Sequence, residues 1–177
     1  TIIHARLAGL DVNETFKNLE SQGFRVINKA QALELTSNKY LTYRAAVKNN
    51  IPAPKTVEVD KNDISLILNT LEDFKVAVLK PVYSQGMGKF CKKIELGISA
   101  KEIEAEIEDT PGETINVQQY INYAKLIRVI VIGGKALKEA TTYDEPPESW
   151  KTSVCMNPNI KKYNFNNPQL FNLAEIV

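Results

Sequence analysis

The stretch that most constrains the fold runs from Val76 to Phe90 and reads Val-Ala-Val-Leu-Lys-Pro-Val-Tyr-Ser-Gln-Gly-Met-Gly-Lys-Phe. It begins with a short apolar run rich in valine, which is typical of a buried strand. The run ends at Lys80, and we expect Pro81 to take the chain away from the sheet because proline cannot continue a central ladder. Phe90 to Leu96 reads as the returning strand.

Between these strands lies a loop, Ser84 to Gly88, with glycines at both ends of its last three residues. A flexible loop beside a lysine at a strand end can fold its backbone N–H groups over a phosphate. The alternative is a plain hairpin with a solvated lysine. A single Gly-x-Gly does not distinguish a phosphate-binding loop from a plain hairpin, so the decision depends on the rest of the chain.

Composition excludes several classes of function. The chain has 177 residues, of which 44% are hydrophobic and 24% charged, with a formal net charge of +1. Bulk electrostatics therefore gives no sign of a nucleic-acid or membrane partner. His4 is the only histidine, and Cys91 and Cys155 have no metal-ligand spacing, so we expect neither a catalytic triad nor a metal site built from these residues. Without a signal peptide or a long apolar run, we expect a cytoplasmic protein with reduced thiols.

The remaining pattern predicts short helices alternating with short strands. Helices are expected over 13–22, 37–49, 62–74, from the Ser99 capping box onward, and over 168–177, and strands over 24–27, 57–59, 114–121, 126–132, 135–141 and 150–155. Gly133-Gly134 between two of the strands indicates a two-residue hairpin turn. We expect a loop over 143–149 and irregular structure over 157–167. Oligomeric state cannot be read from this pattern, and a homo-oligomer is left open.

Three polar residues are expected to have special environments. Asn13 and Ser37 are the predicted N-caps of the first two helices. A cap at Ser37 places Lys39 in the first turn, where the helix dipole disfavours a cation, which suggests that Lys39 is paired with an anion. Arg128 lies between apolar residues on a strand, so we expect it to be buried and to need an anionic partner.

The chain divides naturally near residues 28–37. We expect residues 1–36 to form part of an α/β domain, and residues 37–177 to form a two-layer α+β body with a largely antiparallel sheet. Ile2 and Ile3 read like the middle of a domain, and the last residues read like the middle of a helix. We therefore expect a piece of a longer protein, incomplete at its C-terminal end.

Five stretches in this order resemble the ATP-grasp superfamily and, within it, the RimK-like carboxylate–amine ligases. They are Glu20–Asn28, Ser37–Lys39 with Asn50–Thr56, Leu79–Pro81 with Ser84–Gly88, Val117–Ile121, and Arg128–Gly134 with Trp150–Ser153. The resemblance implies an ATP-grasp fold, with two α+β subdomains preceded by part of an α/β pre-ATP-grasp domain. It also implies an ATP-dependent ligase that forms an amide through an acyl phosphate, adding an amino acid such as glutamate to a small-molecule or peptide carboxylate.

The resemblance also assigns site residues. Lys39 and Lys80 would neutralise the α- and β-phosphates, and Arg128 and Lys151 would act in catalysis near the γ-phosphate or the acyl phosphate. The remaining nucleotide-binding positions are the loop residues Ser84, Gln85, Gly86, Met87 and Gly88, the strand residues Gln118, Gln119, Tyr120 and Ile121, and Ser153. Backbone groups of Gln119 to Ile121 would contact the adenine edge.

The sequence departs from the family pattern in ways that keep a second hypothesis open. Leu126 stands where the family has an aspartate, and Thr141 to Tyr143 stand where an arginine is expected. The ligands for Mg2+, an acidic residue followed by Glu-x-Asn, are expected beyond Val177. The alternative is a non-catalytic ATP-grasp-like protein that binds a nucleotide or a partner without turnover. No nucleic-acid or membrane partner is expected under either hypothesis.

Overall fold

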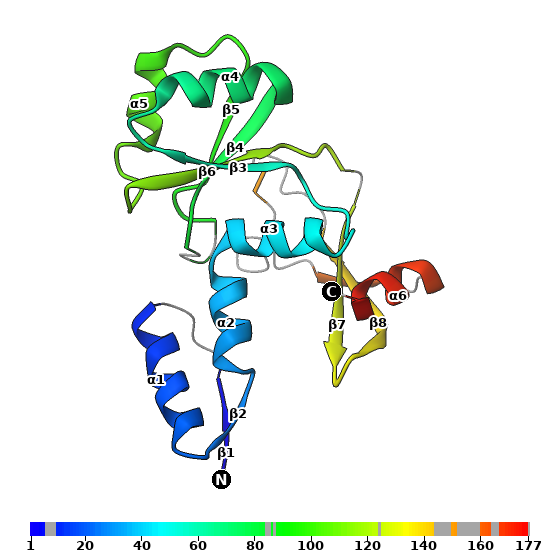
Figure 1. The fold of residues 1–177 in the computed structure, drawn as a ribbon. Helices are drawn as coiled ribbons and strands as arrows, with labels where there is room; N and C mark the ends of the chain where they lie inside the picture. Colours follow the sequence, from blue (N-terminus) through cyan, green and yellow to red (C-terminus); the bar gives the residue numbers. More distant parts are fainter. Residues whose placement is uncertain are drawn as a thin grey trace. The chain divides into compact units, whose positions relative to one another are not determined.

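The computed structural model describes residues 1–5, 10–83, 86, 88–123, 125–143, 150–151, 160–163 and 167–176. The chain forms two compact units (Figure 1). The first comprises Thr1–Gln85 and Phe90–Tyr120, and the second comprises Gly86–Lys89 and Ile121–Val177. Each unit is described by itself.

The first unit begins with a small α/β layer. Strands β1 (Ile2–His4) and β2 (Arg25–Ile27) are parallel, and they are joined by helix α1 (Leu10–Ser21) and followed by helix α2 (Ala30–Ser37). Its apolar core contains Ala5, Val26 and Leu33. Parallel strands joined through a helix are the arrangement expected of an α/β piece.

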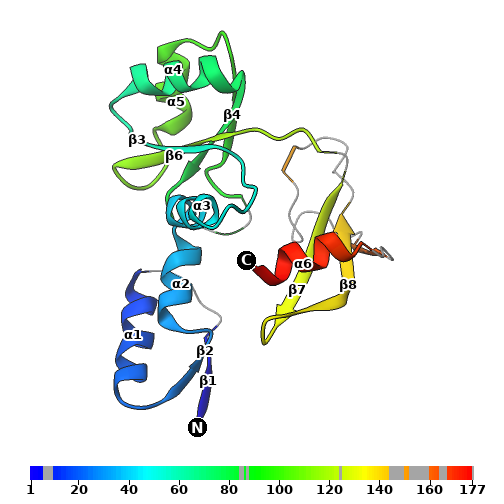
Figure 2. The same ribbon diagram turned by 45° about the vertical axis from the view of Figure 1, so that its right-hand side comes forward.

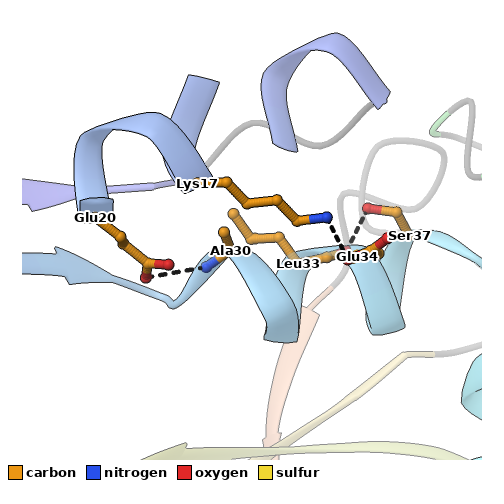
Figure 3. Close-up of polar contacts among 6 residues, drawn as sticks. All are labelled: Lys17, Glu20, Ala30, Leu33, Glu34 and Ser37. Atoms are coloured by element: carbon orange, nitrogen blue, oxygen red, sulfur yellow. Dashed lines mark hydrogen bonds and ion pairs between the residues drawn. The ribbon is translucent and has the colours of Figure 1, made fainter. Parts of the chain in front are cut away.

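Helices α1 and α2 are held together by polar contacts as well (Figure 3). The Lys17 ammonium lies 2.8 Å from the Glu34 carboxylate, and the Ala30 N–H donates to the Glu20 carboxylate at 3.2 Å. Two expectations are wrong in this region. Asn13 lies inside α1 and is buried, so it is not an N-cap. Residues 28–37 were expected to contain a domain boundary, but helix α2 lies there.

A four-stranded antiparallel sheet forms the body of the first unit. Its strands are β3 (Thr56–Asp60), β6 (Thr114–Gln119), β4 (Val76–Pro81) and β5 (Lys92–Glu95), in that spatial order. Helices α4 (Ile64–Phe74) and α5 (Ala100–Ile107) lie on the same side of this sheet (Figures 1 and 2). The predicted capping box of α5 is confirmed, since Ser99 and Glu102 satisfy each other's backbone N–H groups.

Pro81 does not leave the sheet as expected. It is the last residue of β4 and lies opposite Ile115 of β6. On its other side, β5 is paired only as far as Lys92, opposite Leu79. At Pro81 the strand therefore has a single neighbour, and a missing N–H group can be accommodated there.

Helix α3 (Lys39–Lys48) follows α2 after one residue, and its cap differs from the prediction. Ser37 is the last residue of α2, and its hydroxyl donates to the Leu33 carbonyl. The N-cap is Asn38, whose side chain accepts hydrogen bonds from the Tyr40 and Leu41 N–H groups. Lys39 is therefore the first helical residue.

The second unit contains a three-stranded antiparallel sheet, β7 (Leu126–Ile132), β8 (Lys135–Tyr143) and β9 (Ile160–Tyr163), and helix α6 (Pro168–Ile176). Gly133 and Gly134 join β7 to β8, both with φ in the left-handed region, at 59° and 75°, so the predicted hairpin is confirmed. The expectation of irregular structure over 157–167 is wrong where β9 pairs with β8. Of the expected strand over 150–155, residues 150 and 151 are described and are not in a strand.

None of the helices in the described parts of the chain has the length and apolar character needed to cross a membrane.

Candidate functional site

The two faces of the central sheet differ in chemistry. Because side chains alternate along a strand, the register sorts them onto one face or the other. One face is apolar and packs with α4 and α5 in the main core, through Val59, Ala77, Leu79, Ile94, Ile115 and Val117. The opposite face, which we call the polar face, carries Thr56, Glu58, Lys80, Lys93, Asn116 and Gln118. The strand expected over 114–121 is therefore confirmed over Thr114–Gln119, with Ile115 and Val117 in the core.

Lys80 is held on the polar face by a chain of hydrogen bonds. Its ammonium donates to Gln118 Oε1 at 2.5 Å, and Gln118 Nε2 donates to Thr56 Oγ1 at 2.9 Å. The Thr56 hydroxyl in turn donates to the Pro54 carbonyl at 3.0 Å. Lys80 is thus not a solvated surface lysine, and its position is fixed by strands β3 and β6 as well as by its own strand.

Lys39 reaches the same end of β4 from helix α3. Its backbone N–H donates to the Val82 carbonyl at 3.0 Å, and its ammonium donates to the Pro81 carbonyl at 3.1 Å. The structure therefore brings the two predicted lysines together, although they are far apart in the sequence. The Lys39 ammonium thus contacts a carbonyl oxygen, and the anion expected beside it stays a prediction.

Burial lowers the pKa of both lysines below the ordinary lysine value. For Lys39 the positive charge of Lys80, the residue before the Pro81 whose carbonyl Lys39 contacts, lowers the pKa further. The neighbouring Cys91 opposes both shifts. Two cations held close together and partly away from water form a place where an anion would be stabilised.

Cys91 is a neighbour that sequence reasoning missed. Strand β5 begins at Lys92, opposite Leu79, and Cys91, the residue before Lys92, is close enough to Lys39 and Lys80 to affect the pKa of both. Cys91 is free and partly buried. Its place beside the lysines follows from the register of β4 against β5, and the sequence contains no local signal for it.

A pocket of about 370 Å3 lies next to this region, lined by residues that include Asn38, Glu58, Tyr83 and Glu113. Its two carboxylates would repel a phosphate, and neither Lys39 nor Lys80 lines it. We therefore place the candidate anion site at the lysines and not in this pocket.

Asn116 lies on the polar face between Glu58 and Lys80 and is fully buried. Neither of its side-chain polar atoms has a hydrogen-bond partner among the described residues. An unpartnered buried amide is unfavourable by about 1–3 kcal/mol. Such buried groups are rare, and this one lies beside the candidate anion site.

The glycine loop contributes Gly86 and Gly88 to the second unit, where both have positive φ, 73° and 65°. The Lys89 N–H donates to the Gly86 carbonyl at 3.0 Å, which makes a tight turn. A Cβ atom on Gly88 would lie 3.6 Å from Lys151 Cδ, so the loop and the predicted catalytic lysine lie together. The Lys151 ammonium lies 5.5 Å from the centre of the Trp150 ring.

Two backbone N–H groups in the segment predicted to contact adenine already donate hydrogen bonds to neighbouring backbone carbonyls. The Gln119 N–H donates to the Lys55 carbonyl at 2.8 Å, and the Tyr120 N–H donates to the Val76 carbonyl at 3.0 Å. The backbone N–H groups of Gln119 and Tyr120 are therefore already hydrogen-bonded within the first unit. Ile121, which belongs to the second unit, is exposed. The Lys93 ammonium lies 4.7 Å from the centre of the Tyr120 ring.

The remaining predicted residues are placed as follows. Arg128 lies on β7 and is exposed, so the expectation of a buried arginine is wrong. The surrounding strand residues Ile130 to Ile132 are also exposed, which explains why apolar neighbours did not imply burial. Ser84, Gln85, Met87 and Ser153 lie outside the described residues.

Comparison with known proteins gives relatives of one kind. The chain is 32% identical over 143 residues to the tetrahydromethanopterin:alpha-L-glutamate ligase of Methanocaldococcus jannaschii, a match that covers 77% of this chain and 47% of that protein. It is 27% identical over 140 residues to the glutamate–LysW ligase ArgX of Sulfolobus acidocaldarius, covering 78% and 49%. The chain thus spans about half the length of the curated relatives it matches. No family model matches it.

The fold has close counterparts among solved structures. The chain is similar to a RimK domain ATP-grasp protein from Sphaerobacter thermophilus, with a TM-score of 0.76 and 19% sequence identity. The match covers 99% of this chain and 62% of that one. At this identity the similarity establishes the fold, and the expected α+β architecture with largely antiparallel sheets is confirmed.

Proposed function

We propose that the chain binds ATP as part of a RimK-like carboxylate–amine ligase, because it has the ATP-grasp fold and its curated relatives are glutamate ligases. In this reaction a substrate carboxylate attacks the γ-phosphate of ATP to give an acyl phosphate and ADP. The amine of an amino acid, for which we propose glutamate, then displaces phosphate and forms an amide. The observation that carries the proposal is the convergence of Lys39 and Lys80 at one end of β4.

Fixed positive charge is what a triphosphate requires. ATP carries several negative charges, and phosphoryl transfer moves charge onto the leaving oxygens, so preorganised cations and N–H groups stabilise it. We assign Lys39 and Lys80 to the α- and β-phosphates. Their burial means that part of their hydration has already been lost before the ligand arrives, which strengthens their attraction to a phosphate.

The other roles come from the second unit and from the end of β6. We propose that the loop containing Gly86 and Gly88 covers the phosphates, with Lys151 beside it. Gln118 holds Lys80, and adenine lies against the segment from Gln119 to Ile121. We assign Arg128 to the γ-phosphate or the acyl phosphate.

Magnesium is expected to accompany ATP, and when bound it would neutralise part of the phosphate charge. Within the described ranges, no group of three or more histidine, cysteine, aspartate or glutamate residues could hold a metal ion. We therefore assign no magnesium ligand to these residues and derive no step through the metal.

The proposal is tested in two stages. The first is calorimetric titration of ATP into the protein with and without Mg2+. The second measures incorporation of radiolabelled L-glutamate into the acceptors of the relatives, tetrahydromethanopterin and LysW, together with the nucleotide product. The proposal expects ADP and phosphate. Formation of AMP and pyrophosphate would contradict the acyl-phosphate route, and absence of ATP binding would contradict the proposal as a whole.

A second candidate is a protein that binds nucleotide without turnover. Two departures from the family pattern favour it. Leu126 stands where the resembled ligases have an aspartate, and Thr141 to Tyr143 stand where an arginine is expected. Leu126 and Tyr143 pair with each other on β7 and β8. Saturable ATP binding without product from any acceptor would favour this candidate over the ligase.

A further inference from the structure

The hydrogen bonds behind Lys80 have a fixed direction. Thr56 is 5% exposed, and Gln118 lies directly opposite it in the β3–β6 register. The Thr56 hydroxyl has one proton, and the Pro54 carbonyl can only accept a hydrogen bond, so that proton points to Pro54. Toward Gln118, the Thr56 oxygen can therefore act only as an acceptor.

This direction fixes the orientation of the Gln118 amide. Its NH2 group must face Thr56, since Thr56 accepts, and its oxygen must then face Lys80. In the flipped orientation the NH2 group would face the Lys80 ammonium, placing donors against donors, and the amide oxygen would face the Thr56 oxygen. The threonine hydroxyl therefore selects the amide orientation that supports an ammonium group.

We propose that Thr56 is a positioning residue for Lys80, acting through the orientation of the Gln118 side chain. The inference rests on the proposed function, because it assigns Thr56 to the nucleotide site without contact to the nucleotide. By keeping the Gln118 amide oxygen turned toward Lys80, Thr56 stabilises the charged form of Lys80. This opposes the burial of Lys80, which favours the neutral amine.

Other charged or titratable groups also face Lys80. Lys39 approaches from α3 and Cys91 from the β5 side, while Lys93 and Glu58 lie on the same face of the neighbouring strands. A change at Thr56 leaves all of these in place. A change in the pH at which Lys80 titrates would therefore reflect a change in the orientation of the Gln118 side-chain amide.

The test compares Thr56→Val with Thr56→Ser and with a matched control, Thr70→Val. Thr70 is also buried, and its hydroxyl also donates to a backbone carbonyl, that of Leu66, at 2.7 Å, but it lies on α4, which packs against the apolar face. The first measurement is an NMR titration of the lysine side chains, in which the Lys80 signal is identified by its loss in Lys80→Arg. The second is the affinity for ATP by calorimetry.

We expect Thr56→Val to shift the titration of Lys80 to lower pH and to weaken ATP binding roughly 3- to 10-fold, the effect of one neutral hydrogen bond. Thr56→Ser should restore both, and Thr70→Val should change neither. If Lys80 titrates identically in Thr56→Val and Thr70→Val, the inference is overturned. If Thr56→Val does not fold, Thr56→Ala provides the same comparison without the added methyl group.

The lysine titration does not require a ligand, so the inference and the proposed function can fail separately. If the wild type does not bind ATP but Lys80 shifts in Thr56→Val alone, the proposed function is wrong and the positioning role stands. If ATP binds and Lys80 does not shift, the proposed function stands and the positioning role is wrong.

Discussion

Replacing Lys80 with methionine should separate ligand binding from stability. Methionine keeps an unbranched chain of similar length and removes the ammonium that donates to Gln118. In the free protein two effects oppose each other. A partly buried cation is removed, which is favourable, and the Gln118 oxygen loses its donor, which is unfavourable by about 1–3 kcal/mol. We expect a net change in the free energy of unfolding of less than about 1 kcal/mol.

ATP affinity should fall much further. A hydrogen bond to a charged group contributes about 1.5–3 kcal/mol, and partial burial of Lys80 places its contribution in the upper part of this range. A loss of about 2–3 kcal/mol corresponds to binding that is roughly 30- to 150-fold weaker. At ATP 100-fold above the wild-type Kd, the wild type would be stabilised by about 2.7 kcal/mol. A variant with 100-fold weaker binding would gain only about 0.4 kcal/mol.

The assay is calorimetric titration of ATP, with thermal unfolding in the same buffer. Lys92→Met is the matched control, because Lys92 lies on the adjacent strand β5, faces the opposite side of the sheet and pairs with Glu106 at 3.3 Å. The control should bind ATP within about twofold of the wild type, as expected for the loss of an exposed ion pair. Equal ATP affinity in the wild type and in Lys80→Met would refute the role assigned to Lys80.

Three further predictions follow from the described side chains. Because burial lowers the pKa of Lys39 and Lys80 and a phosphate would raise it, ATP binding should take up protons, seen as a binding enthalpy that depends on the ionisation enthalpy of the buffer. Asn116→Leu should raise the free energy of unfolding by about 1 kcal/mol in urea titrations, because an unpartnered buried amide is removed. Ser99→Ala should lower it by about 1 kcal/mol, through loss of the α5 capping box with Glu102.

The pH dependence has a definite sign. In the free protein Lys39 and Lys80 have lowered pKa values, so between those values and the ordinary lysine value near 10.4 the unfolded chain binds more protons. Stability of the free protein should therefore rise with pH across this window, while ATP affinity falls. Proton release on ATP binding, a loss of stability in Asn116→Leu, or an unchanged Ser99→Ala would each contradict the corresponding prediction.

Local signals in the sequence predicted local structure well. The strand ending near Lys80, the hairpin at Gly133-Gly134 and the Ser99 capping box depend on residues within a few positions of each other, and all are present in the structure. The cap of α3 was misplaced by one residue because Ser37 and Asn38 are both good N-cap residues. Only the packing of α2 against α3 decides between them.

Features that depend on the register or on distant segments have no local signal in the sequence, and only the family resemblance placed Lys39 and Lys80 at one site. Cys91 lies beside the two lysines only because β5 pairs with β4 in one register, and Lys39 reaches Pro81 only because α3 packs at the end of β4. Arg128 was expected to be buried because its neighbours are apolar, but much of β7 is exposed. Strand β9 was missed because its lysines suggested a solvated segment.

The convergence of Lys39 and Lys80 on a nucleotide phosphate is the central claim, and an ATP derivative with a reactive acyl group on its terminal phosphate tests it most directly. Such a probe acylates lysines that lie beside the bound phosphates, and the lowered pKa of both residues increases the fraction of reactive neutral amine. Peptide mass spectrometry should find the label on Lys39 or Lys80, and excess ATP should suppress it. Label spread over exposed lysines such as Lys48 and Lys101, and unaffected by ATP, would contradict the account.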